Sequence, residues 1–236
     1  MKRSYPISVA MATFNGEKYI QEQLKSILLQ LDVHDEIVIS DDGSTDRTKE
    51  IIQAFQDNRI FLIEGPKNGI KQNFANAIQN CRGKYIFLSD QDDIWEKDKV
   101  RTVLSVFEKN EKCNCVIHDC KVFDANIENI IYESFFRYRN SGKGILKNII
   151  KNTYIGCCMA FDSKWKEKVL PIPNNIEMHD QWIGILCEKF GKSIFINNKL
   201  IKYRRHESNS SSLQHYGIMK MLKNRIKLFL ALLKRL

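Results

Sequence analysis

The sequence lacks any long apolar run. Across its 236 residues, no stretch reaches the roughly 18–20 continuous apolar residues that a membrane-spanning helix needs. The N-terminal MKRSYPISVAMATFN has no extended apolar segment and no clear cleavage site, so we expect no signal peptide. Internal repeats and long linkers are also missing. The length therefore predicts one α/β domain, or at most two small ones.

A regular cysteine pattern is missing too. Seven cysteines, an odd number, are scattered along the chain, which argues against a disulfide framework and for a reducing compartment. The segment CNCVIHDC contains four potential zinc ligands, Cys113, Cys115, His118 and Cys120. Their spacing is not that of a usual zinc finger, and alternation along a strand would point them to different faces. We expect ordinary strand cysteines here rather than structural zinc.

Acidic residues are absent from Gln214 to Leu236. This segment carries six basic residues, which are two thirds of the net charge of +9. A sequence pI of about 9.1 suits nucleic acid or an anionic membrane as a partner. Because the rest of the chain is only mildly basic, we expect no nucleic-acid partner.

The same segment is amphipathic. On a helical wheel, the lysines Lys220, Lys223, Lys227 and Lys234 fall together. The apolar residues on the other side are Ile218, Leu222, Ile226, Phe229, Leu233 and Leu236. This pattern is typical of an interfacial helix that is attracted to anionic lipid. The alternative is an amphipathic helix that packs on its own domain.

The first hundred residues alternate between apolar β-rich segments and helical patterns. Expected strands cover 6–13, 35–40, 59–65 and 84–89, and expected helices cover 16–31, 44–55 and 68–81. This rhythm predicts a parallel sheet with helices on both faces. The later part of the chain is less regular. It predicts helices over 100–109 and 180–191 and strands over 115–124, 154–162, 193–197 and 199–206. We also expect a mobile loop over 133–144 and a flexible link over 207–212.

Acidic residues follow two of the expected strands. Asp90, Asp92 and Asp93 end one strand, and Asp41 and Asp42 end another. Ligands of parallel sheets bind beyond the carboxyl ends of the strands, so these segments should converge. The first cluster suits Mg²⁺ or Mn²⁺, which prefer hard oxygen ligands, although a solvated acidic loop has the same pattern. The second suits a base or ribose, or a plain turn followed by a helix N-cap.

The ordered set of motifs resembles a known family. ISVAMATFNGEKYI, IVISDDGSTDRT, KYIFLSDQDDIWEKDKV, YIGCCMAF, HDQW and YRRH follow one another at suitable distances over roughly residues 5 to 210. Together they are similar to inverting family 2 glycosyltransferases with the GT-A fold, a Rossmann-like and mostly parallel α/β sheet. The DQDDIW and YRRH segments are most similar to bacterial enzymes of surface-polysaccharide assembly, among them rhamnosyltransferases.

The resemblance implies roles on the donor side. Residues implied in contacts to the nucleotide, the donor sugar or the diphosphate are Thr13, Phe14, Asn15, Asp42, Asp90, Asp93, Trp95, Arg204 and Arg205. The implied metal ligands are Asp92, Asp90 and His206, with Mg²⁺ or Mn²⁺ as the cofactor. Phe14 stands where a tyrosine is frequent in the family, which removes a hydroxyl from the nucleotide pocket.

The resemblance also implies a catalytic base and an acceptor side. Asp180 matches the base, and the acceptor-side residues are Gly156, Cys157, His179 and Trp182, with Met159 closing that segment. His179 stands where a glutamate often precedes the base. Without the resemblance, Asp180 is more simply a helix N-cap, His206 a surface histidine, and the tryptophans packing residues.

The predicted function is transfer of a UDP- or dTDP-linked sugar to a hydroxyl of a glycan or lipid-linked acceptor. The alternatives are a nucleotidyltransferase and a sugar-nucleotide-binding protein without turnover. We expect a glycosyltransferase domain over 1–210, divided into a nucleotide-binding half (1–100) and an acceptor-side half (101–210), and a basic helix over 214–236. The expected location is cytoplasmic, at the inner face of the cytoplasmic membrane.

Overall fold

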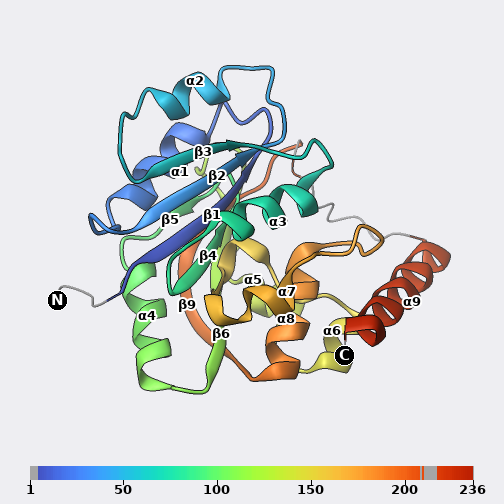
Figure 1. The fold of residues 1–236 in the computed structure, drawn as a ribbon. Helices are drawn as coiled ribbons and strands as arrows, with labels where there is room; N and C mark the ends of the chain where they lie inside the picture. The colour runs from blue at the N-terminus through green and yellow to red at the C-terminus, as the bar shows by residue number, and fades with distance from the viewer. Residues whose placement is uncertain (1–4, 208, 210–216, 236) are drawn as a thin grey trace.

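A computed structural model describes residues 5–207, 209 and 217–235 (Figure 1). Its centre is one nine-stranded sheet with the order β3-β2-β1-β4-β8-β6-β9-β5, and β7 pairs with β6. The expected α/β fold is confirmed. Four neighbouring strands at one end, β3-β2-β1-β4, are all parallel, whereas β8 is antiparallel to both of its neighbours.

The first part of the chain forms the parallel end of the sheet. Its strands are β1 (Ile7–Thr13), β2 (Glu36–Asp41), β3 (Ile60–Glu64) and β4 (Tyr85–Ser89), and its helices are α1 (Ile20–Leu28), α2 (Thr48–Gln53) and α3 (Ile70–Asn80). These elements follow the predicted order. Strands β1, β2 and β4 are buried along their whole length, as continuous apolar runs predict for strands covered on both faces.

The second part adds the mixed end. Its strands are β5 (Ile94–Trp95), β6 (Cys113–Phe123), β7 (Ile130–Tyr132), β8 (Met159–Asp162) and β9 (Lys192–Arg204). Its helices are α4 (Lys99–Lys109), α5 (Phe135–Arg139), α6 (Ile145–Ile150), α7 (Lys166–Val169), α8 (His179–Phe190) and α9 (Ile218–Arg235), with short 3₁₀ turns η1 (Gly156–Cys158) and η2 (Ser163–Trp165).

The core lies on both faces of the sheet. Alternate residues of β1 belong to two apolar clusters, because successive strand side chains point to opposite faces. Helices α1 and α4 contribute to one cluster, and α3, α8 and α9 to the other. In Figure 1, α9 is coloured red and lies beside α6, at the opposite end of the molecule from α2.

Three local predictions differ from the structure. Residues 133–144, expected as a mobile loop, contain α5, because Ser134 caps this helix by accepting the amide of Arg137 at 3.1 Å. The two expected closing strands form one strand, β9, with irregular pairing to β6. The expected strand 154–162 begins as the turn η1 and becomes extended only at Met159.

The cysteines of the CNCVIHDC segment lie on β6 and are buried. Cys115 belongs to one apolar cluster, and Cys113 and Cys120 belong to the other. The segment therefore divides its sulfur atoms between the two faces of the sheet. Simple alternation would put Cys113 and Cys115 on one face, and the irregular pairing of β6 with β9 between these two residues separates them.

Candidate active site

A cavity of about 470 Å³ lies at the carboxyl ends of the parallel strands. Asp42, Asp90, Asp92 and Asp180 all line it, although they are far apart in the sequence. The predicted convergence of the acidic segments is therefore confirmed. Their chemical roles remain predictions.

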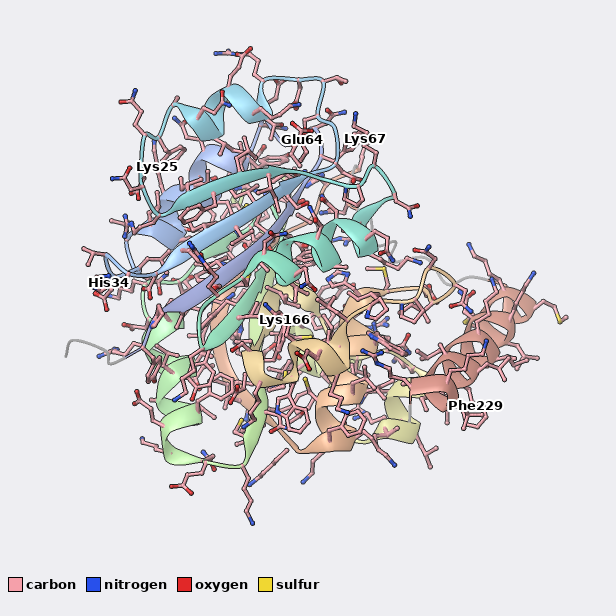
Figure 2. The ribbon with its side chains drawn as sticks, in the orientation of Figure 1. Lys25, His34, Glu64, Lys67, Lys166 and Phe229 are labelled. Carbon is pink, nitrogen blue, oxygen red and sulfur yellow. The ribbon has the colours of Figure 1, made fainter. Side chains whose placement is uncertain are left out.

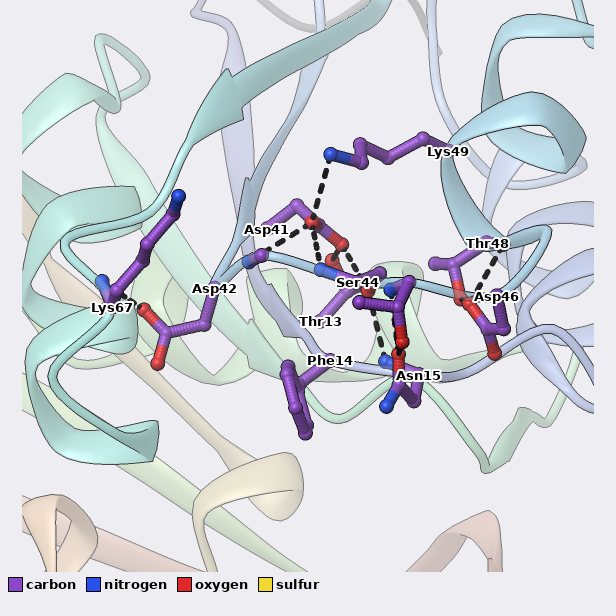
Figure 3. Close-up of polar contacts among 12 residues, drawn as sticks. Thr13, Phe14, Asn15, Asp41, Asp42, Ser44, Asp46, Thr48, Lys49 and Lys67 are labelled. Atoms are coloured by element: carbon purple, nitrogen blue, oxygen red, sulfur yellow. Dashed lines mark hydrogen bonds and ion pairs between the residues drawn. The ribbon is translucent and has the colours of Figure 1, made fainter.

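Asp41 ends β2 and Asp42 follows it, and the two side chains have different surroundings (Figure 3). The buried Asp41 carboxylate accepts hydrogen bonds from the hydroxyl of Thr13 at 2.9 Å, and from the amide and hydroxyl of Ser44 at 2.8 and 2.6 Å. Asp42 lines the cavity and accepts the amides of Lys67 and Gly69 at 2.6 and 2.9 Å. Asp41 therefore builds the turn, and Asp42 is the carboxylate that a ligand in the cavity can reach.

The segment after β1 also contains both residues that line the cavity and a residue that holds the loop. Thr13 and Phe14 line the cavity, and the side chain of Phe14 is 55% exposed. Phe14 is held by Gln91, whose side chain accepts its amide at 2.9 Å and donates to its carbonyl at 3.1 Å. Asn15 has a positive φ of 47°, and its side chain accepts the amide of Thr45 at 2.9 Å. Asn15 is not among the described residues that line the cavity. Its hydrogen bond to Thr45 instead holds the loop after β1 against the turn after β2.

Two of the three carboxylates after β4, those of Asp90 and Asp93, have raised pKa values. Burial, followed by the charges of Asp92 and Asp180, raises the pKa of Asp90 to about 7. Burial, followed by the charges of Asp92 and Asp90, raises the pKa of Asp93 well above its usual value. One Asp93 oxygen accepts the amide of Arg204 at 3.0 Å, and the other has no partner among the described residues.

This donor set fits a hard divalent cation, because several carboxylates face one space and disfavour one another's ionisation. Asp90, Asp93 and Cys157 place one ligand atom each within 4.8 Å of one another. Burial raises the pKa of the Cys157 thiol well above its usual value, so its sulfur is neutral and unsuited to Mg²⁺. The carboxylates are the better donors.

Two residues of the YRRH segment surround this acidic cluster. The buried Arg204 guanidinium donates to the carbonyls of Asp92 and Ala125, each at 2.7 Å, and to Glu22 at 2.6 Å. His206 Nε2 lies 2.8 Å from Asp92 Oδ2. His206 is therefore beside a predicted metal ligand, whereas the described contacts of Arg204 join α1, the acidic loop and the segment after β6.

Arg205 and Trp95 lie elsewhere in the described structure. Arg205 donates to the hydroxyl of Tyr203 at 3.2 Å, and it is not among the cavity-lining residues described. Trp95 is buried in the core, where its ring packs near Phe87 and under the ammonium group of Lys99, 3.9 Å from the ring centre. Lys99 also donates to the carbonyl of Cys157 at 2.7 Å. Packing is the role that these contacts indicate for Trp95.

Asp180 lies in the first turn of α8 and lines the same cavity as the acidic loop. Its Oδ1 accepts Asn152 Nδ2 at 3.0 Å and the amide of Gln181 at 2.6 Å. Burial raises its pKa to about 6. A carboxyl group with this pKa ionises near neutral pH and then binds a proton more strongly than an exposed aspartate, which suits a general base.

His179, directly before Asp180, also lines the cavity. Its ring stacks on Phe74 with 4.0 Å between centroids, and neither ring nitrogen has a hydrogen-bond partner among the described residues. Burial, followed by the charge of Lys71, lowers its pKa to about 3, so the ring is neutral. Two unpaired nitrogens at a cavity wall indicate a contact to a ligand.

Of the remaining described residues predicted for the acceptor side, only Gly156 lines the cavity. A Cβ atom there would lie 2.9 Å from His179 Nε2, which explains the glycine. Cys157 is buried behind it, and Met159 begins β8 within the core. Trp182 is buried and donates to the carbonyl of Val169 at 2.8 Å, so its described contacts are those of a packing residue.

The sequence matches a known family over most of this region. The profile of glycosyl transferase family 2 covers residues 8–170. The chain is 32% identical over 220 residues to the dTDP-rhamnosyl transferase RfbG of Shigella flexneri, with 84% of this chain and 72% of the relative aligned. The chain belongs to glycosyl transferase family 2. The predicted family and enzyme class are thus confirmed.

Further similarities support this membership. The chain is 27% identical over 221 residues to the putative teichuronic acid biosynthesis glycosyltransferase TuaG of Bacillus subtilis, covering 87% of this chain and 81% of TuaG. Among solved structures, TarS residues 1–349 of S. aureus in complex with UDP-GlcNAc aligns with a TM-score of 0.71 at 17% identity. That alignment covers 88% of this chain and 62% of the TarS chain, and it confirms the fold.

A mannosyltransferase of Pyrobaculum calidifontis, PcManGT, in complex with GDP-Man and Mn²⁺, has the same fold, with a TM-score of 0.66 at 16% identity. The alignment covers 88% of this chain and 59% of PcManGT. This chain thus spans about six tenths of the length of both structural neighbours.

Sequence reasoning missed several cavity residues of this family 2 member. They include Lys67, Gly69, Asn73, Gln91, Tyr203 and Asn209. Lys67 and Gly69 follow β3, so the strand-end rule that selected Asp42 could also have selected them. Asn209 donates to Asp92 Oδ2 at 3.2 Å, and no local sequence signal marked it.

Proposed function

We propose that this chain transfers a sugar from a UDP- or dTDP-linked donor to a hydroxyl of a glycan or lipid-linked acceptor, in bacterial cell-surface polysaccharide synthesis. The observation that carries the proposal is that Asp42, Asp92 and Asp180 line one cavity. The names of RfbG and TuaG, a dTDP-rhamnosyl transferase and a putative teichuronic acid biosynthesis enzyme, support the donor and pathway class.

On the donor side, we assign the nucleotide to the half formed by residues 1–100. Asp42 and Thr13 lie at the strand ends that face the cavity, and Phe14 presents an exposed ring beside them. A carboxylate in this position suits the donor groups of a pyrimidine or a ribose, and an aromatic ring suits the face of a base.

Asp90 and Asp92 would hold Mg²⁺ or Mn²⁺, with His206 hydrogen-bonded to Asp92. When bound, such a cation neutralises negative charge on the departing nucleoside diphosphate. The raised pKa of Asp90 supports this assignment, since a cation would relieve the repulsion that causes part of the shift.

Asp180 would act as the base. The acceptor hydroxyl loses its proton to the Asp180 carboxylate while its oxygen bonds to the anomeric carbon, and the bond from that carbon to the diphosphate oxygen breaks. One displacement inverts the anomeric centre. Asn152 and the Gln181 amide hold the carboxylate in one orientation, which favours the reactive geometry.

The test is a panel of UDP-, dTDP- and GDP-sugars incubated with Mg²⁺ or Mn²⁺, with nucleotide release as the readout. We expect metal-dependent release from one donor and its loss by about three orders of magnitude in Asp180→Asn. Asp98→Asn is a control, since Asp98 lies outside the cavity, where its side chain is 46% exposed and pairs with Arg101. Donor binding without release would favour a binding protein, and formation of a sugar nucleotide would favour a nucleotidyltransferase.

For the location, we propose the cytoplasmic side of the membrane, where nucleotide sugars are made. None of the helices within residues 5–207 and 217–235 is long and apolar enough to cross a bilayer.

A further inference from the structure

Helix α9 is attached to the domain by one of its faces. Leu228, Ala231 and Leu232 are buried against the core. Arg225 donates to the carbonyl of Ile150 at 2.7 Å, and Arg235 binds backbone carbonyls around α7. The helix therefore packs on its own domain, as one of the two sequence interpretations predicted.

This packing uses a different face from the apolar side of the helical wheel. The side chains of Leu222, Ile226, Phe229, Leu230 and Leu233 are 49–54% exposed, and Met219 is 79% exposed. At 100° per residue, these positions span one continuous side of the helix, next to the packed face. Figure 2 shows Phe229 projecting from α9 into solvent. We call these six residues the apolar stripe; the side chain of Ile218 and all of Leu236 lie outside the described structure.

Helix α6 extends the stripe. Leu146 and Ile150, four residues apart and thus on one side of α6, are 76% and 62% exposed. The bond from Arg225 to the Ile150 carbonyl places this end of α6 against α9. Large exposed apolar side chains therefore lie on two adjacent helices, which is unusual for elements that face only water.

A row of lysines borders the stripe. Lys220, Lys223, Lys227 and Lys234 lie within about 60° of one another on α9, between the stripe and the packed face. No acidic residue lies on α9. A second copy docking stripe to stripe would bring two lysine rows together without acidic partners on this helix, which opposes self-association. An anionic bilayer would bury the apolar side chains and attract the lysine ammonium groups.

We propose that the surface formed by the apolar stripe, Leu146, Ile150 and the lysine row docks on an anionic lipid bilayer. This surface does not depend on sugar transfer, but it fits a lipid-linked acceptor. Asn224 of α9 donates to Glu177 at 2.8 Å, three residues before Asp180. Docking through α9 would therefore keep the acceptor side of the cavity close to the membrane.

Vesicle co-sedimentation of the full chain tests the proposal. We expect binding to vesicles of phosphatidylglycerol and phosphatidylcholine, and much weaker binding to phosphatidylcholine alone. The variant Leu222→Ser/Ile226→Ser/Phe229→Ser should lose at least about tenfold in affinity, because these side chains insert between lipids. The variant Lys223→Gln/Lys227→Gln/Lys234→Gln should lose roughly fivefold for each lysine and should depend less on salt.

Control variants carry changes of the same kind at other exposed positions. Leu29→Ser/Val33→Ser removes side chains that are 87% and 79% exposed near α1, and Lys25→Gln/Lys109→Gln/Lys112→Gln removes exposed lysines of other elements. Both should bind vesicles like the unmodified chain, as should Asp180→Asn, which separates docking from catalysis. Circular dichroism checks that α9 still folds.

Two results would overturn the proposal. One is unchanged vesicle binding by the folded Leu222/Ile226/Phe229 variant. The other is a dimer in analytical ultracentrifugation that the same variant dissociates, together with no vesicle binding by the unmodified chain, which would assign the surface to a second copy.

Discussion

His206 Nε2 lies 2.8 Å from Asp92 Oδ2, which joins the residues after β9 to the acidic loop after β4. Asn209 donates to the same oxygen at 3.2 Å, and the His206 ring packs on Tyr19 with 4.8 Å between centroids. Asp92, one of the two carboxylates proposed to hold the cation, is therefore oriented by residues that follow β9.

This contact predicts that His206→Ala lowers the apparent affinity of the enzyme for its metal ion. Without the histidine, Asp92 loses its orientation, and the Mn²⁺ concentration for half-maximal nucleotide release should rise by about 10–100-fold. His34→Ala, at an exposed residue between α1 and β2, is the control. Equal metal dependence of His206→Ala and the unmodified chain would mean that the contact only packs the loop.

The pKa of Asp180 predicts the pH dependence of the reaction. A base must be ionised, so the rate at low substrate should rise as pH increases through about 6 and then level off. A pH–rate profile of nucleotide release measures this. A profile whose acidic limb lies near pH 4, the range of an exposed aspartate, would contradict the buried base.

The same pKa predicts a stability gain from Asp180→Asn. The folded-state pKa of about 6 lies above the unfolded value of 3.8, so Asp180 favours the folded state only when protonated, and this contribution is lost as pH rises through about 6. At pH 7.5 the variant should unfold with a free energy higher by roughly 1–3 kcal/mol, and the gain should vanish below about pH 4. Urea titrations at both pH values test this.

His179→Phe should separate stability from activity. Phenylalanine preserves the stack on Phe74 and removes two buried nitrogens that lack partners among the described residues, so the melting temperature should stay the same or rise. If a substrate uses one of those nitrogens, nucleotide release should fall by about tenfold or more. A variant that is both stable and fully active would show that His179 only fills space.

The neighbours Asp41 and Asp42 should respond in opposite ways to the same substitution. Asp41→Asn should lower the free energy of unfolding by roughly 1–3 kcal/mol, because its carboxylate accepts several buried hydrogen bonds in the turn. Asp42→Asn should have a smaller effect on stability and should weaken nucleotide binding by about tenfold, measured by calorimetry with UDP and dTDP. Identical profiles for the two variants would contradict the division between turn and ligand site.

The sequence predicted the edge of the sheet where the acidic residues meet, because parallel strands bring their carboxyl ends together whatever their loops contain. It could not separate Asp41 from Asp42, since the direction of each side chain depends on how the turn to Ser44 closes. Nor could it place Tyr203 and Asn209 at the cavity. Their position follows from β9 pairing with both β6 and β5, with irregular register along β6, and no local pattern encodes that register.

Trp95 and Arg204 are residues for which the sequence predicted ligand contacts and the described structure shows other contacts. Their motif positions indicated ligand contacts, but the same side chains can meet the needs of packing and backbone hydrogen bonding. Trp95 lies in the core, and the Arg204 guanidinium binds carbonyl groups of Asp92 and Ala125. A motif fixes where a residue lies along the chain more reliably than it fixes which way the side chain points.

The sheet order also has a consequence for synthesis on the ribosome. Strand β9 lies between β6 and β5, and the amide of Arg204 near its end binds Asp93. A nascent chain that has not yet extended past β9 leaves β5 without its partner strand and the acidic loop without that amide. The acidic wall of the cavity is thus completed only after β9 has been translated, so the strand pairing and the Arg204 contact that position this wall form late in synthesis.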